Sequence, residues 1–150
     1  MKCTIFALAF FSLTLPAFGQ GVDPLIGTWK LNVAKSTGAL IRSQTLTWAM
    51  EGQTLTNTAE GVDAQGQPLP KAVFIHIYDG KPHPTTGNPN FDSTTYTRMG
   101  NVISILRFKN GKPVLVGQAI IDPGKTYTLI QGGIDLNNQP GYAVLVYDRQ

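Results

Sequence analysis

Two arginines and a tyrosine fall on one face of a predicted β-hairpin. The dipeptide Gly100-Asn101 is typical of a two-residue hairpin loop, and it joins alternating runs at 94–99 and 102–108. In this register one face carries Tyr96, Arg98, Ile103, Ile105 and Arg107. Two guanidinium groups that frame apolar side chains are suited to hold the acid end of an apolar ligand. We therefore predict a ligand-binding face here, the alternative being two rim arginines that are solvated or paired with carboxylates.

The two histidines suggest a core residue and a loop residue. His76 alternates with aromatic residues along a predicted strand, so we expect it to point inward and to be hydrogen-bonded in the core. His83 lies in a proline-rich loop, and Asp79 and Asp92 are near it in sequence. These four residues match no recognised metal-ligand spacing, so we predict no metal site and no cofactor.

Catalytic motifs are not evident in the sequence. It has no Gly-x-Ser-x-Gly segment, and its nine acidic residues are scattered over predicted turns and strand ends. We therefore predict a protein that binds and does not catalyse.

Composition indicates one well-packed domain. The chain has 150 residues, of which 42% are hydrophobic and only 14% are charged. A chain of this length and apolar content can bury a sizeable core. The net charge of +3 is not concentrated in a basic run, so nucleic acid is not an expected partner.

The first 19 residues resemble an export signal. Lys2 precedes an apolar stretch, Ile5–Leu15, that is too short to span a bilayer, and small residues before Gln20 fit a cleavage site after Gly19. Cleavage would remove Cys3, the single cysteine, and would leave residues 20–150 as one domain. We expect a periplasmic or extracellular protein with no membrane-spanning segment after cleavage.

The remaining sequence predicts an all-β protein. Threonine-rich alternating runs are separated by frequent Gly and Pro turn residues, and we count nine strands with one short helical turn near 34–41. Consecutive strands with short links favour an up-and-down antiparallel barrel of about eight to nine strands, because closure removes the exposed edges. A two-layer β-sandwich is the alternative.

The two ends of this domain resemble the calycin superfamily, which comprises the lipocalins and the fatty-acid-binding proteins. Gly27–Leu31 reads Gly-Thr-Trp-Lys-Leu, and the chain ends Val-Tyr-Asp-Arg-Gln. The resemblance implies a barrel in which Arg149, from the last strand, packs over Trp29 in the first. It also implies a ligand contact for Tyr147. The Gly-Thr-Trp-Lys-Leu-Asn start, an Asp-Gly-Lys turn and a Thr-Gly-Asn-Pro stretch are most similar to uncharacterised secreted lipocalin-like proteins of soil bacteria.

Two departures from the family pattern affect the predicted site. Ten residues, 34–43, are too few for the two helices that fatty-acid-binding proteins place after strand one. The family's ligand-binding arginine two positions before the final tyrosine is Leu145 here. Carboxylate capture in the family's manner is therefore not expected, and the arginines of the predicted hairpin would replace it.

Two functions from different classes follow. The first is non-catalytic binding of a small apolar or amphipathic, fatty-acid-like molecule by a monomer or weak dimer. The second is a protein-interaction or inhibitor module that uses the proline-stiffened loop at 79–92, the longest irregular stretch between the predicted strands.

Overall fold

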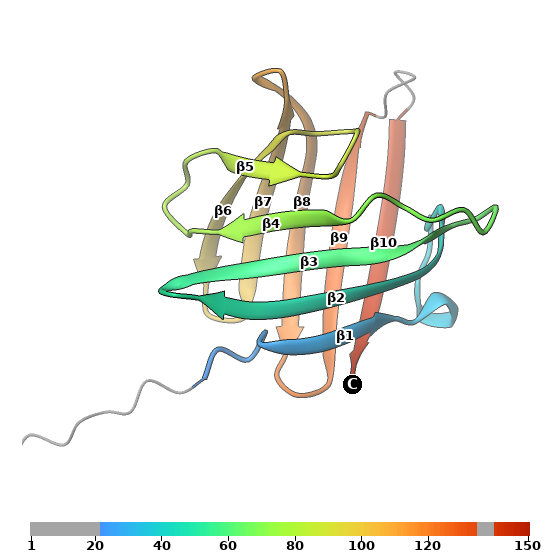
Figure 1. Cartoon of the computed structure of the whole chain (residues 1–150), viewed down its shortest axis with the longest axis horizontal. Helices are drawn as coiled ribbons and strands as arrows, with labels where there is room; N and C mark the ends of the chain where they lie inside the picture. Colours follow the sequence, from blue (N-terminus) through green and yellow to red (C-terminus); the bar gives the residue numbers. More distant parts are fainter. Residues whose placement is uncertain (1–21, 135–139) are drawn as a thin grey trace, which may run out of the picture.

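In the part of the chain that the structure describes, ten strands close into one antiparallel β-barrel (Figure 1). The computed structural model describes residues 22–134 and 140–150. The strands are β1 (Gly27–Leu31), β2 (Ile41–Glu51), β3 (Thr54–Asp63), β4 (Ala72–His76), β5 (His83–Thr86), β6 (Ser93–Met99), β7 (Val102–Lys109), β8 (Lys112–Asp122), β9 (Thr126–Ile134) and β10 (Pro140–Arg149). A short 3-10 helix, η1 (Val33–Lys35), follows β1. The export signal predicted for 1–19, with Cys3, lies outside the described residues.

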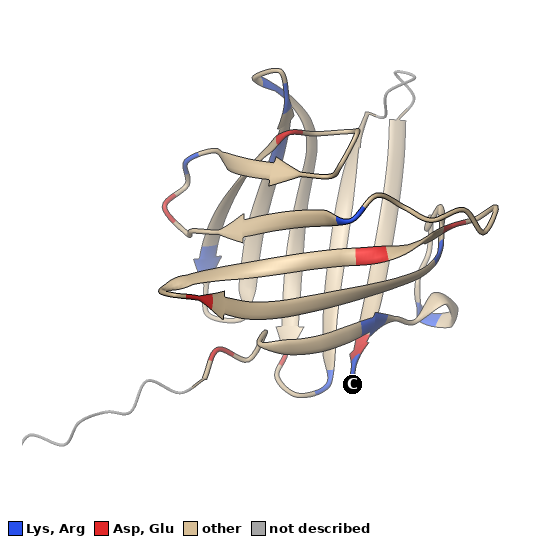
Figure 2. Cartoon of the chain, viewed as in Figure 1, with Lys and Arg blue, Asp and Glu red and all other residues tan. Residues whose placement is uncertain are grey.

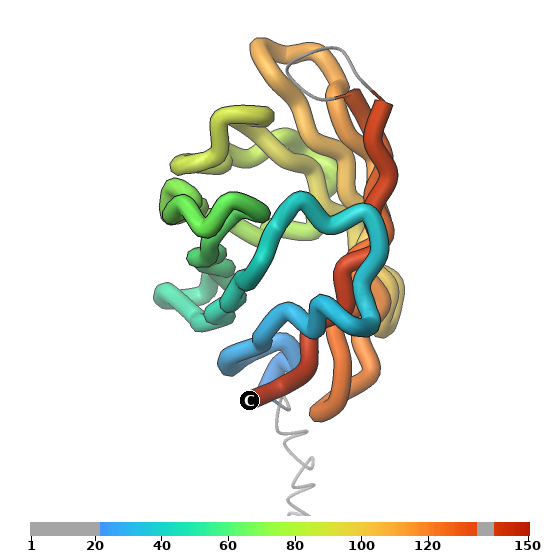
Figure 3. Tube along the Cα trace, turned by 90° about the vertical axis from the view of Figure 1, so that its right-hand side faces the viewer, coloured from blue at the N-terminus to red at the C-terminus, as the bar shows by residue number. Residues whose placement is uncertain are grey.

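Each strand pairs with its neighbours in sequence, and β1 pairs with β10 to close the barrel. The predicted up-and-down barrel is therefore confirmed, and the sandwich alternative is not adopted. Strands β1–β5 run across β6–β10 (Figure 1), and a view from the side shows the two halves as facing layers (Figure 3). Within the described part of the chain, no helix combines the length and the apolar character needed to span a membrane.

The strand that the sequence prediction missed is β5, which lies inside the segment expected to be an irregular loop. It has four residues, His-Pro-Thr-Thr, and forms only two residue pairs with β4 and two with β6. Proline removes a ladder donor, and four residues are too few for an alternation signal. Residues 79–92 are therefore partly barrel wall, and the one large apolar side chain after β5, Phe91, is 4% exposed and packs inward.

The β6–β7 hairpin has the register that the sequence predicted. Met99 pairs with Val102 and Tyr96 pairs with Ile105, so the expected alternation of faces holds. Gly100 has a φ of 59°, whereas Asn101 does not adopt positive φ. Glycine at the first loop position alone is the pattern of a type II′ turn, which matches the twist of the two strands.

The two ends of the barrel differ in how they are filled. The end that contains the β6–β7 turn and Leu25, which we call the closed end, is packed with buried side chains such as Trp29, Ile103 and Ile121. The opposite end, which we call the open end, includes residues 38–40 of the short connection between η1 and β2. Charges of both signs are interspersed over the strands and turns visible in Figure 2.

Candidate functional site

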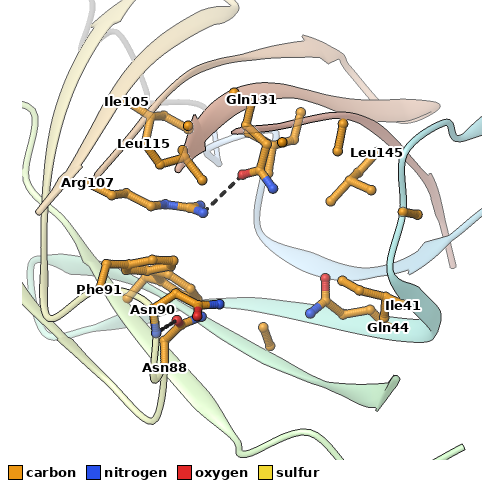
Figure 4. Close-up of a pocket in the computed structure, with 18 of the residues that line it drawn as sticks. Ile41, Gln44, Asn88, Asn90, Phe91, Ile105, Arg107, Leu115, Gln131 and Leu145 are labelled. Carbon is orange, nitrogen blue, oxygen red and sulfur yellow. Dashed lines mark hydrogen bonds between the residues drawn. The ribbon is translucent and has the colours of Figure 1, made fainter. Parts of the chain in front are cut away.

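A cavity of about 320 Å³ occupies the barrel interior toward the open end (Figure 4). Most of its lining is apolar, from residues such as Ile41, Leu129 and Leu145. Two large apolar side chains of the lining, Leu40 and Tyr142, are 80% and 65% exposed and mark its mouth. The volume is at the lower end of the range for small-molecule sites.

Five rings form the floor of the cavity and separate it from the closed end. His76 stacks on Tyr96 with ring centroids 4.0 Å apart, and it lies 4.4 Å from Trp48. Tyr127 lies 5.7 Å from Trp48 and 5.7 Å from Tyr147. The alternation of each strand sends these side chains inward, and the aromatic contacts hold them in fixed positions.

Among the described residues of the cavity lining, Arg107 is the one charged side chain. It is 9% exposed, and its guanidinium lies 4.4 Å from the Phe91 ring centroid and 5.5 Å from that of Phe74. Nη1 donates to Gln131 Oε1 at 3.0 Å (Figure 4), whereas Nε is buried and has no partner among the described residues. None of the ion pairs formed by the described residues includes Arg107.

A second polar pair joins Tyr147 of the cavity floor to Gln44, which also lines the cavity. The Tyr147 hydroxyl donates to Gln44 Oε1 at 2.6 Å. Burial raises the pKa of Tyr147, so the hydroxyl keeps its proton at neutral pH. Tyr147 therefore reaches the cavity as a neutral group whose donor is already used.

The predicted ligand face is divided between the two ends of the barrel. Tyr96, Ile105, Arg107 and Tyr147 line the cavity, whereas Arg98 and Ile103 do not. Arg98 lies at the closed end, where Nη1 pairs with Asp23 Oδ2 at 2.5 Å and Nε donates to the Gly100 carbonyl at 3.0 Å. Alternation fixes the face on which a residue lies but not its depth, and each second residue moves about 7 Å along a strand. The two arginines therefore do not frame one ligand.

Barrel closure brings Trp29 and Arg149 together. They are direct partners in the β1–β10 ladder, and the guanidinium carbon lies 5.1 Å from the indole centroid. Arg149 also donates to the carbonyls of Pro24 and Ile26 at 2.9 and 2.7 Å. This group covers the closed end and contributes no side chain to the cavity.

The histidines lie in two unrelated environments. His76 points inward as predicted, but it is held by ring stacking, and Nδ1 has no hydrogen-bond partner among the described residues. Burial, followed by the charges of Arg107 and Arg98, lowers the pKa of His76 to about 3, so the ring is neutral.

His83 pairs with Asp79 at 2.9 Å, whereas Asp92 accepts from the Asn110 amide. Among the described residues, no three potential metal-ligating side chains gather at one place.

Several site residues were not found by sequence reasoning. They are Gln44, Trp48, Asn57, Phe91 and Gln131. Gln131 continues the inward alternation of Tyr127 and Leu129, so a signal existed for it. Asn57 lies between two threonines, and the alternation of threonine along β3 marks the opposite face of the strand. Phe91 lies outside any strand, and no periodicity could place it.

No protein-family model matches this sequence, and no curated protein is significantly similar to it. Solved structures are similar in fold. The zebrafish ileal bile acid-binding protein complexed with cholic acid has a TM-score of 0.56 and 14% identity, over 85% of this chain and 100% of that one. The fatty-acid-binding protein of Manduca sexta has a TM-score of 0.53 and 15% identity, over 83% and 98%. A variant of the fluorescent protein UnaG has a TM-score of 0.53 and 15% identity, over 85% and 96%.

The barrel is similar in fold to those of the bile acid-binding and fatty-acid-binding proteins. At these identities the likeness establishes the calycin-like fold alone. No sequence comparison supports the narrower resemblance to secreted lipocalin-like proteins of soil bacteria.

Proposed function

We propose that this protein binds a small amphipathic molecule with an acidic end, without catalysis, inside the barrel. The observation that carries the proposal is Arg107, a cavity-lining arginine that is 9% exposed and that forms no ion pair among the described residues. Buried charges in proteins are almost always paired, because desolvation of a lone ion is costly. A ligand carboxylate would supply the missing partner.

The surroundings of Arg107 prepare it for this role. Phe91 and Phe74 lie against the guanidinium, and Gln131 fixes one nitrogen, so the side chain is oriented before a ligand arrives. Nε is a further donor, which is buried and has no partner within the described ranges. A charge-assisted bond from such a group to a carboxylate is about twice as strong as a neutral hydrogen bond. The apolar part of the ligand would lie against the aliphatic lining.

The predicted export belongs to the same proposal. A binder in the periplasm or outside the cell, acting as a monomer or weak dimer, would collect a sparingly soluble acid. Two structures of similar fold support the proposal of small-molecule binding. The zebrafish protein is complexed with cholic acid, and the Manduca sexta protein is a fatty-acid-binding protein.

Titration calorimetry with dodecanoate tests the proposal. We expect saturable 1:1 binding to the wild type, and a loss of at least about tenfold in affinity for Arg107→Met, since a hydrogen bond to a charged group contributes about 1.5–3 kcal/mol. Arg98→Met is the matched control, because Arg98 is outside the cavity lining, and we expect it to retain wild-type affinity. Absence of saturable binding, or equal affinity in the wild type and Arg107→Met, would refute the proposal.

A further inference from the structure

Three buried polar atoms of residues that line the cavity have no hydrogen-bond partner among the described residues. They are Trp48 Nε1, Asn57 Nδ2 and His76 Nδ1. Their residues are 2%, 5% and 6% exposed, and all three line the cavity. Buried polar groups in folded proteins are nearly always satisfied, so three exceptions at one place require an explanation.

The fold brings these three side chains onto neighbouring strands. Trp48 on β2 is the direct ladder partner of Asn57 on β3. His76 on β4 is opposite Leu55, one diagonal step from Asn57, and its ring lies 4.4 Å from that of Trp48. Inward residues at diagonal positions of adjacent strands are within reach of one another for long or aromatic side chains.

The other tryptophan, Trp29, shows that a buried indole N–H in this barrel can have a hydrogen-bond partner. Trp29 is also fully buried, yet its Nε1 donates to the Leu25 carbonyl at 2.7 Å. The fold can therefore satisfy a buried indole at the closed end, whereas the indole on the cavity floor has no partner in the part of the chain that the structure describes.

The chemistry of the three groups defines what they can bind. An indole N–H is a donor only, and an amide nitrogen is a donor. His76 is neutral because burial and the charge of Arg107 oppose its protonation, so its ring offers one donor and one acceptor. The three groups carry no charge, and they suit an uncharged oxygen, either a carbonyl that accepts or a hydroxyl that accepts and donates.

We propose that Trp48, Asn57 and His76 bind an uncharged oxygen of the same ligand whose carboxylate contacts Arg107. The ligand class is thereby narrowed from a plain fatty acid to a hydroxy or oxo aliphatic acid. This inference rests on the proposed function, because it assumes that an amphipathic acid enters the cavity.

Paired ligands test the inference. ω-Hydroxy acids of eight, ten and twelve carbons are titrated into the wild type, each against the unsubstituted acid of equal length. We expect the hydroxy acid to bind about five- to tenfold tighter for at least one chain length, as one net hydrogen bond provides. Equal or weaker binding of the hydroxy acid at every length would overturn the inference and leave the proposed function intact. Failure of both series to bind would overturn both.

Variants of the lining residues test which side chains cause the preference for the hydroxy acid. Trp48→Phe and Asn57→Leu remove donors while they keep most of the side-chain volume, and we expect each to abolish the preference for the hydroxy acid. Leu46→Met is the matched control, since Leu46 also lines the cavity and has no polar group. An undiminished preference in both donor variants would overturn the assignment.

Nuclear magnetic resonance provides a readout that does not depend on whether the variants fold. The chain has two tryptophans, so a ¹H–¹⁵N spectrum contains two indole signals. We expect the Trp48 signal to differ between complexes with the hydroxy acid and the plain acid of equal length, while the Trp29 signal, already bonded to Leu25, is the same in both. An identical Trp48 signal in the two complexes would contradict the contact.

Discussion

The closed and open ends of the barrel use the same residue types in opposite ways. At the closed end Arg98 pairs with Asp23, and Arg149 lies over Trp29 and donates to two carbonyls. At the open end the Arg107 guanidinium has, among the described residues, one amide partner, and its Nε has none. Under the proposed function this difference separates two tasks: satisfied polar groups stabilise the fold, whereas unsatisfied ones in the cavity lining bind a ligand.

The largest expected effect is on the closed end. Trp29→Ala removes a side chain with 0% exposure together with its bond to Leu25, and we expect it to lower the free energy of unfolding by about 3–5 kcal/mol. Trp48→Phe keeps an aromatic ring of smaller volume and removes a donor that has no partner within the described structure, so we expect a smaller loss, of about 1–2 kcal/mol. Urea denaturation measures both, and a similar loss in the two variants would remove the distinction between the ends.

The lowered pKa of His76, a residue of the cavity floor, predicts that the free energy of unfolding depends on pH. Burial holds its pKa in the folded protein at about 3, below the ordinary value of 6.5. As pH falls from about 6.5 toward 3, the unfolded chain binds a proton that the folded protein does not, so the free energy of unfolding decreases. We expect the wild type to lose a few kcal/mol over this interval.

The comparison with His76→Phe isolates this contribution, since phenylalanine preserves an inward ring and cannot titrate. Asp79, Asp92 and Asp148 also have lowered pKa values, mainly because backbone amides or Asn32 donate to them, and they contribute equally to both proteins. We expect a smaller slope of stability against pH for His76→Phe, measured by urea denaturation from pH 4 to 6.5. Parallel slopes would mean that the pKa of His76 is not lowered in the folded protein, and would contradict the prediction.

A smaller effect is expected for the ion pair at the closed end. The side chains of Arg98 and Asp23 are only 16% and 26% exposed, so the pair is screened less than a surface ion pair. We expect Arg98→Met and Asp23→Asn each to lower the free energy of unfolding by about 1–2 kcal/mol. A double-mutant cycle should show that the losses are not additive, and additive losses would contradict a direct interaction.

How far the sequence predicts this molecule can be seen in its β6–β7 hairpin. Gly100-Asn101 determined the turn, alternation determined the faces, and both follow from local backbone chemistry. The positions of Arg98 and Arg107 along the barrel axis depend on how the hairpin packs in the barrel. The local sequence pattern does not specify these positions.

The floor and the wall of the cavity illustrate the same limit. Trp48, Asn57 and His76 meet through the β2–β3 and β3–β4 pairings, and no single segment carries the pattern. Phe91 reaches the cavity from an irregular segment after a four-residue strand that contains proline, which periodicity cannot recognise. The fold class could therefore be predicted from local sequence patterns, whereas the composition of the site could not, because it depends on long-range strand pairing.

The central claim is that Arg98 stabilises the fold while Arg107 serves a ligand. Thermal unfolding of Arg98→Met and Arg107→Met, each with and without saturating dodecanoate, tests it directly. We predict that Arg98→Met unfolds at a lower temperature and is stabilised by dodecanoate as much as the wild type, and that Arg107→Met unfolds at or above the wild-type temperature and is stabilised less. An Arg107→Met protein that loses intrinsic stability as Arg98→Met does, or that dodecanoate stabilises as it does the wild type, would contradict the account.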